Sequence, residues 1–231
     1  MEQACRALEF AEENARTQHP YPRDFIRAYL LLGELLTLRG VTDESRRGRQ
    51  VEIQFYDEPF QQSVESVTVR PNTHSRIAER CLEEALRRCR KINLVESEPD
   101  ILLVRAKLLR ARGTAKETRA WEEPLKEAQE IAARAGYRLK LADIHLFCGQ
   151  VLVDLGQERL LGLNAREHIA KAKEYAKDVS ALDDLYKSPD PHFYDRIPQY
   201  EMLTHGMTPE QQIKNGYYVA WLTADALEKR L

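Results

Sequence analysis

A segment that recurs three times restricts the folds open to this chain of 231 residues. Each copy has a small residue followed seven positions later by a glycine, with leucines three positions before and three positions after the small residue. The small residues and their glycines are Gly33 and Gly40, Ala106 and Gly113, and Gly149 and Gly156. Because residues three apart lie on one face of a helix, the pattern predicts three equivalent helices. We expect each helix to end at its glycine in the left-handed conformation.

A second set of segments predicts another helix after each of the first. Residues 82–92 and 125–135 align at an offset of 43 residues, which is also the offset between Ala106 and Gly149. Residues 169–179 form a third copy, 44 residues further on. The sequence therefore predicts an all-α fold, an α-solenoid of three consecutive antiparallel helix hairpins with a period of about 43 residues.

The small residue in each first helix and an alanine in each second helix resemble the tetratricopeptide repeat (TPR), in which these positions let two helices approach closely. Gly33, Ala106 and Gly149 suit the small position, but the period is longer than about 34 residues and the family's early Trp and terminal Pro are missing. Longer versions are similar to the sensor repeats of bacterial signal-transducing ATPase regulators of the STAND type, and residues 165–178 have this character. The resemblance covers roughly residues 21–178. The period also suits HEAT or armadillo units.

Residues 41–73 interrupt the repeat as an insertion inside the first hairpin. Val51, Ile53 and Phe55 alternate with polar residues, and Val67 and Val69 do the same after a short connection. Alternation with a period of two is typical of a half-buried strand, so we expect a short β-hairpin here.

The ends of the chain also differ from the repeat. Residues 1–17 read as a capping helix, and residues 180–231 begin irregularly and end in a closing helix. Thr208 suits the N-cap of that helix, with Pro209 in its first turn. Tyr217, Tyr218 and Trp221 are expected to seal the last hairpin. We expect residues 1–231 to form a single domain.

Composition argues against several classes of function. Lys and Arg total 35 against 37 Asp and Glu, a formal net charge of −2, which does not favour a surface for nucleic acid or anionic lipid. The apolar runs fall far short of the roughly 20 residues that span a bilayer, and the first residues lack the features of a signal peptide. We expect a cytoplasmic protein with no membrane contact. Basic runs at residues 46–49 and 87–91 leave nucleic-acid binding as an unfavoured alternative.

The sequence lacks the motifs of common cofactor and metal sites. It has neither a GxxxxGK[ST] nor a GxGxxG loop, so we expect no nucleotide cofactor. Its four cysteines form no CxxC pair, which argues against a zinc site. His145 and His168 stand on repeat helices and are expected to pack in the core. We therefore expect no catalytic residues, no cofactor and no metal, in a protein that is not an enzyme.

One polar cluster keeps an enzyme or a metal-binding protein open as the alternative. Asp190, His192, Asp195, Glu201 and His205 lie within one irregular segment. Two imidazoles and three carboxylates are suitable ligands for a divalent metal, although their spacing matches no known ligand motif.

Stacked hairpins form a concave groove that is lined by the first helix of each hairpin. The resemblance to the TPR implies which positions face this groove. The candidate partner-binding residues at these positions are Arg27, Glu34, Thr37, Asp100, Lys107, Arg110, Asp143, Gln150 and Asp154. Lys107 and Arg110 suit charge-assisted hydrogen bonds with an acidic peptide or a C-terminal carboxylate. A solvated face with salt bridges inside the solenoid is the open alternative.

We therefore expect a protein–protein interaction scaffold or a signalling sensor module that binds a protein or peptide partner in the groove. The resemblance to ATPase regulators adds one candidate partner, an ATPase or effector domain of a larger protein. The inserted β-hairpin is a second candidate surface, because an exposed strand edge can pair with a partner's strand. Alternatively, the β-hairpin folds back on the solenoid.

Overall fold

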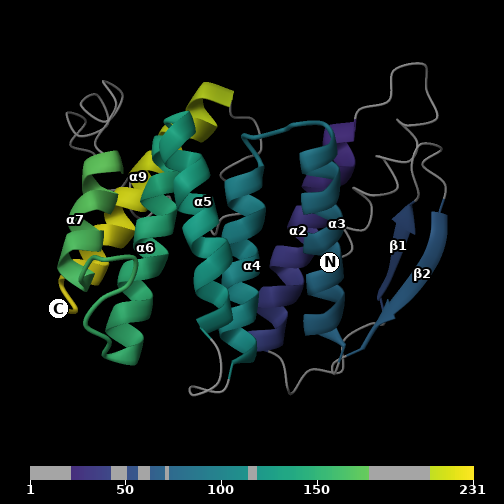
Figure 1. Cartoon of the computed structure of the whole chain (residues 1–231), viewed down its shortest axis with the longest axis horizontal. Helices are drawn as coiled ribbons and strands as arrows, with labels where there is room; N and C mark the ends of the chain where they lie inside the picture. Colours follow the sequence, from purple (N-terminus) through teal and green to yellow (C-terminus); the bar gives the residue numbers. More distant parts are fainter. Residues whose placement is uncertain (1–21, 43–50, 57–62, 71–72, 114–118, 177–208) are drawn as a thin grey trace, which may run out of the picture. The chain divides into compact units, whose positions relative to one another are not determined.

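The computed structural model of the chain describes residues 22–42, 51–56, 63–70, 73–113, 119–176 and 209–231. Within these ranges the chain is mostly helical, with seven α-helices and one two-stranded antiparallel sheet (Figure 1). The α-helices are α2 (Pro22–Thr42), α3 (His74–Lys91), α4 (Glu98–Arg112), α5 (Glu122–Ala135), α6 (Arg138–Leu155), α7 (Ala165–Ala176) and α9 (Pro209–Glu228). The short 3-10 helix η1 is Arg119–Trp121, and the strands are β1 (Val51–Tyr56) and β2 (Ser63–Val69). The predicted helical class and the predicted β-hairpin are confirmed.

The chain divides into two compact units, and the boundary between Ile131 and Ala132 falls inside α5. Unit 1 contains α2, the two strands, α3, α4, η1 and most of α5, and unit 2 contains the end of α5, α6, α7 and α9. The single domain expected over residues 1–231 stays a prediction.

In unit 1, α2 and α3 pack against each other as a helical hairpin. A Cβ atom added at Gly33 of α2 would lie 2.6 Å from Cδ2 and 2.7 Å from Cγ of Leu82 on α3. Because contacts this short are not tolerated, the missing side chain of Gly33 is what allows the two helices to approach.

In unit 2, α6 and α7 form a second hairpin with the same close contact. A Cβ atom added at Gly149 of α6 would lie 3.2 Å from Cγ1 of Ile169 on α7. Gly149 aligns with Gly33, and Ile169 aligns with Leu82 in the predicted repeat. The two hairpins therefore repeat one helix contact at equivalent positions.

The next described helix after each of these hairpins contacts both of its helices. In unit 1, α4 packs on α2 and on α3, and in unit 2, α9 packs on α6 and on α7. Ala85, Ala128 and Ala172, which align in the three second helices, are fully buried. Small side chains at these positions leave room for the neighbouring helices.

Of the three predicted helix ends, the one at Gly156 is confirmed, the one at Gly113 is right in position but not in conformation, and the one at Gly40 is wrong. Gly156 follows α6 with φ of 60°, in the left-handed conformation that glycine adopts without a steric penalty. However, α2 continues through Gly40 to Thr42, and a glycine inside a helix costs only about 1 kcal/mol relative to alanine. Gly113 is extended, with φ of −70° and ψ of 120°, and its N–H donates to the carbonyls of Leu109 and Arg110. The turn at the end of α4 is therefore closed without a left-handed residue.

The β-hairpin packs on the hairpin of α2 and α3. Ile53 and Phe55 are buried, and the Phe55 ring stacks on Tyr29 of α2 with 5.6 Å between centroids. The Tyr29 hydroxyl donates to the Gln54 carbonyl over 3.3 Å. From α3, Arg80 donates two hydrogen bonds to Glu65 of β2, and its guanidinium lies 3.9 Å from the Phe55 ring centroid. The structure therefore agrees with the alternative in which the insertion folds back on the helices.

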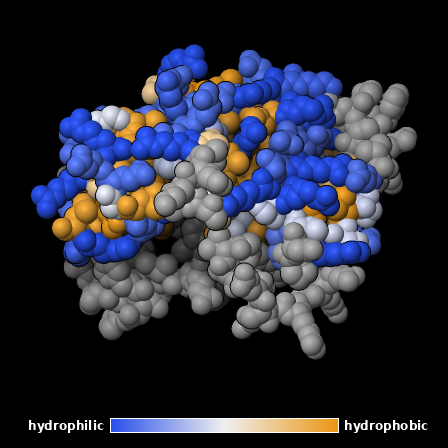
Figure 2. Space-filling model, turned by 60° about the horizontal axis from the view of Figure 1, so that its bottom comes forward, coloured by the Kyte–Doolittle hydropathy of each residue, from blue (hydrophilic) through white to orange (hydrophobic). Residues whose placement is uncertain are grey.

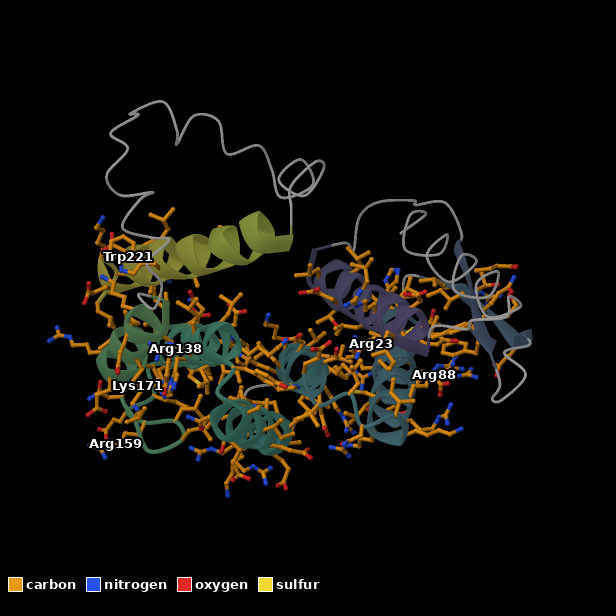
Figure 3. All side chains as sticks on the ribbon, turned by 90° about the horizontal axis from the view of Figure 1, so that it is seen from above. Arg23, Arg88, Arg138, Arg159, Lys171 and Trp221 are labelled. Atoms are coloured by element: carbon orange, nitrogen blue, oxygen red, sulfur yellow. The ribbon has the colours of Figure 1, made fainter. Side chains whose placement is uncertain are left out.

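The starts of α7 and α9 follow from their sequences. The Asn164 side chain accepts the Glu167 N–H over 2.9 Å, and the Glu167 carboxylate accepts the Asn164 N–H over 2.7 Å, which is a capping box. Helix α9 begins at Pro209, as predicted. Trp221 of α9 (Figure 3) is partly buried and packs against a core cluster of unit 2, with Lys173 Nζ 5.3 Å from its ring centroid. The expected helix at residues 1–17, the expected N-cap Thr208 and the side chains of Tyr217 and Tyr218 lie outside the described part of the chain.

Candidate functional site

The surface in Figure 2 is covered mostly by hydrophilic residues, with hydrophobic residues in separate patches between them. The candidate partner-binding residues lie on three helices, which are α2 and α4 in unit 1 and α6 in unit 2.

On α2, Arg27 is exposed and Glu34 is half-buried. They stand seven residues apart and so share one side of the helix. Within the described part of the chain, neither side chain forms a hydrogen bond or an ion pair. Both charges are accessible from outside the unit.

The structure corrects the prediction that Thr37 is a partner-binding residue. Its side chain is buried, with 7% of its surface exposed, and its hydroxyl donates to the Gly33 carbonyl over 2.7 Å. A threonine on a helix satisfies its hydroxyl in this way when it has no outside partner. Thr37 is therefore part of the packing of α2 and does not present its hydroxyl to a ligand.

On α4, Asp100, Lys107 and Arg110 are all half-buried. Asp100 and Arg110 take part in further interactions. Lys107, by contrast, forms no hydrogen bond or ion pair with any residue that the structure describes. In the repeat, Lys107 of α4 aligns with Glu34 of α2, and Asp100 aligns with Arg27, so equivalent positions carry opposite charges.

On α6, helix α9 covers much of the surface that was predicted to face a groove. Leu146 and Val153 pack against the core cluster that contains Leu227 of α9. The Gln150 amide nitrogen donates to the Asp154 carboxylate over 2.5 Å. The Gln150 amide oxygen accepts from Arg230, which lies just beyond α9, over 3.3 Å. Gln150 and Asp154 are thus engaged inside unit 2. Asp143 is exposed and takes part in a further interaction.

Several charged residues of α3 are paired with charged residues of neighbouring helices. Arg90 of α3 donates to Glu98 over 2.6 Å and to Glu127 of α5 over 2.5 Å. Arg112, at the end of α4, pairs with Glu79 of α3 over 2.6 Å. Exposed pairs of this kind contribute little stability each.

The basic run at residues 87–91 is neutralised within the fold. Arg88 is 1% exposed, its Nε lies 2.6 Å from Glu84, and its guanidinium lies 4.8 Å from the Phe25 ring centroid. Burial alone would raise the pKa of Glu84, but hydrogen bonds from Arg87 and Arg88 outweigh it and hold the pKa below its ordinary value. This run therefore does not support nucleic-acid binding, and the other run, at residues 46–49, lies outside the described residues.

The expectation that His145 and His168 pack in the core is confirmed, since both are fully buried. Their Nδ1 atoms lie 2.8 Å apart, and Nε2 of His168 lies 2.9 Å from the Leu160 carbonyl. A carbonyl only accepts, so Nε2 of His168 carries the hydrogen and its Nδ1 accepts from His145 in the neutral pair. Burial lowers the pKa of His145 to about 3 and also lowers the pKa of His168, so both rings are neutral at neutral pH.

This paired arrangement was not predicted from the sequence. The available signal was the repeat register, in which His145 stands four residues before Gly149 and His168 one residue before Ile169. Two buried rings that satisfy each other are not free to act as a base on a substrate. Burial also raises the pKa of the neighbouring Cys148 to about 12, so this thiol is not a nucleophile at neutral pH.

Metal and membrane sites find no support in the described ranges. No group of three or more His, Cys, Asp or Glu residues there is placed to hold a metal ion. The cluster proposed for the enzyme or metal alternative, Asp190, His192, Asp195, Glu201 and His205, lies outside these ranges. Among the described helices, none has the length and apolar character needed to cross a membrane.

Comparison of the chain with known protein families, with characterised proteins and with solved structures gave no match.

Proposed function

We propose that the chain is a TPR-like α-solenoid that serves as a protein–protein interaction scaffold or sensor module in the cytoplasm. Two features of the structure support the helical repeat. The close contact between Gly33 and Leu82 recurs between Gly149 and Ile169 at aligned positions. In both units, the next described helix packs on both helices of the hairpin, which is how one hairpin adds to another in a solenoid.

The observation that carries the proposed function is the unpaired Lys107 on α4. The Lys107 side chain is half-buried and has no acidic partner among the described residues. Acidic residues are nevertheless common, since 37 of the 231 residues of the chain are Asp or Glu. A half-buried charge loses hydration, and a partner carboxylate would restore the lost interaction as a charge-assisted hydrogen bond. Arg110 stands one turn further along the same helix.

The ligand proposed for this surface is an acidic peptide segment or a C-terminal carboxylate on a protein partner. Lys107 would act as a point charge, and Arg110 would add a planar donor that can bind a carboxylate with two hydrogen bonds. An ATPase or effector domain of a larger signalling protein is one partner that fits the proposal. The enzyme or metal-binding alternative rests on residues 190–205, which lie outside the described residues.

Affinity capture from a source lysate tests this function. The bait variant Lys107→Glu/Arg110→Glu reverses both charges, and the control Lys126→Glu/Arg134→Glu makes the same change in net charge on exposed positions of α5. We expect a partner that is retained by the native chain and the control but lost by the α4 variant. Circular dichroism and thermal melting establish that the α4 variant is folded. The proposal is wrong if the native chain captures nothing, or if the α4 variant retains every partner.

A further inference from the structure

The outward surface of α2 carries two leucines between its charged residues. Arg27, Leu31, Glu34 and Leu38 follow one another at spacings of four, three and four residues, so they form one stripe along the helix. Leu31 is 42% exposed and Leu38 is 58% exposed. The opposite side of α2 holds its buried residues, among them Phe25, Tyr29, Leu32 and Leu36. We refer to Arg27, Leu31, Glu34 and Leu38 as the α2 stripe.

Among the described helices of unit 1, α3 and α4 pack against one side of α2 (Figure 3). The α2 stripe thus faces away from the helices that pack against α2. A spacing of four and three residues is the heptad pattern by which one helix packs along another. In this heptad, Leu31 and Leu38 occupy one of the two contact positions (a), and Arg27 and Glu34 occupy the other (d).

The two charged residues of the α2 stripe, Arg27 and Glu34, are available to pair with a second molecule. Arg27 and Glu34 are separated by seven residues, or about 10 Å along the helix axis, so they are poorly placed to pair with each other. Neither forms an ion pair or a hydrogen bond with another residue that the structure describes. A basic and an acidic group therefore flank an exposed leucine.

Two copies of the α2 stripe have complementary charges when the two helices run antiparallel. In an antiparallel pair of α2 helices, a two-fold axis close to Leu31 places Arg27 of each copy beside Glu34 of the other. The same axis brings the two Leu31 side chains together at the centre. Both ion pairs and the apolar contact are then formed by one surface meeting itself, as in a two-fold symmetric dimer interface.

We infer that the α2 stripe is a dimerisation surface, and that its partner is α2 of a second copy of this chain in antiparallel orientation. This inference goes beyond the proposed binding of a partner through α4. If dimerisation covers Arg27 and Glu34, Lys107 and Arg110 on α4 remain for the other protein. The two proposals are tested with different residues, so the failure of one is distinguishable from the failure of the other.

Charge reversal tests the orientation and the pairing together. Arg27→Glu places two acidic groups face to face at each end of the dimer, and Glu34→Arg places two basic groups there. We expect each single change to weaken dimerisation by about tenfold, since two rim pairs turn from attraction to repulsion. Sedimentation velocity over a wide range of protein concentrations measures the dissociation constant. Circular dichroism checks that the variants keep their helical content.

Two rescue experiments make the test specific. The double variant Arg27→Glu/Glu34→Arg restores opposite charges at both pairs, so its dissociation constant should return close to the native value. An equimolar mixture of the Arg27→Glu and Glu34→Arg chains should form a heterodimer more tightly than either chain forms a homodimer. Leu31→Glu removes the central apolar contact and should weaken the dimer in every charge background.

The inference is overturned by any of three results. The native chain is monomeric at the highest concentration measured, the single reversals leave the dissociation constant of a dimer unchanged, or the double variant is as weak as the single variants.

Discussion

Gly33 of α2 and Leu82 of α3 are so close that a Cβ atom on Gly33 would lie 2.6 Å from a methyl carbon of Leu82. The aligned pair in the other hairpin, Gly149 and Ile169, has the corresponding distance of 3.2 Å. The tighter contact involves Cγ of Leu82 as well, which moves only if the whole side chain moves. The two glycines thus tolerate substitution to different degrees.

Gly33→Ala should lower the free energy of unfolding by about 1–2 kcal/mol, because the overpacking outweighs the gain of about 1 kcal/mol in helix propensity. Gly149→Ala should be close to neutral, since Ile169 has to shift by only a few tenths of an ångström. Urea denaturation followed by circular dichroism measures both. In a Leu82→Ala background the penalty at Gly33 should disappear, and an unchanged penalty would refute the contact.

The His145 and His168 pair should make stability fall in acid. The pKa of His145 is about 3 in the folded chain against an ordinary value of 6.5, so the unfolded chain binds more protons between these values. Stability is therefore complete above about pH 6.5 and is lost as the pH falls towards about 3, by up to about 1.4 kcal/mol per pH unit from His145 alone.

The variant His145→Leu/His168→Gln lacks both titrating rings, and the new amide at position 168 retains a donor for the Leu160 carbonyl. Its free energy of unfolding should fall less steeply between pH 6.5 and pH 4 than that of the native chain. Urea midpoints at a series of pH values supply the comparison. Parallel curves for the two proteins would show that the pair does not titrate on unfolding.

Glu84 is shared by two neighbouring arginines with very different surroundings. Arg88 is buried, whereas the Arg87 side chain is 50% exposed. Arg88→Ala should cost about 3 kcal/mol, because it removes the buried partner of Glu84 and the packing on Phe25. Arg87→Ala is the matched control and should cost less than about 1 kcal/mol. Equal losses in chemical denaturation would contradict the burial of Arg88.

The β-hairpin should contribute to the stability of unit 1. Phe55→Ala removes a buried ring that contacts Tyr29 and Arg80, and it should cost about 3 kcal/mol. Glu52→Ala changes an exposed residue of the same strand and should cost less than about 0.5 kcal/mol. Limited proteolysis should cut the strands of the Phe55 variant sooner than those of the native chain. No difference between the two variants would mean that the β-hairpin is not docked.

Periodicity in the sequence was sufficient to predict the helices and the strands. The spacing of Gly33, Ala106 and Gly149 located three first helices, and the alternation at Val51, Ile53 and Phe55 located a strand, because both signals depend only on local geometry.

Features that depend on neighbouring elements were not predicted. Thr37 is buried because other elements pack against α2, and the pairing of His145 with His168 needs the relative position of two helices. Arg88 was placed in a basic run, yet it follows Cys81 and Ala85 at helical spacing and so lies on the buried side of α3. The helical spacing thus indicated that Arg88 is buried, but the basic run was interpreted from its charge alone.

Hydrogen–deuterium exchange of the native chain, with and without a captured partner, locates the binding surface. We predict slower exchange in the partner-bound chain along α4, around Asp100, Lys107 and Arg110, and no such slowing in the Lys107→Glu/Arg110→Glu variant. Slower exchange confined to β1 and β2, or to residues 190–205, with α4 unchanged, would contradict a binding surface on α4.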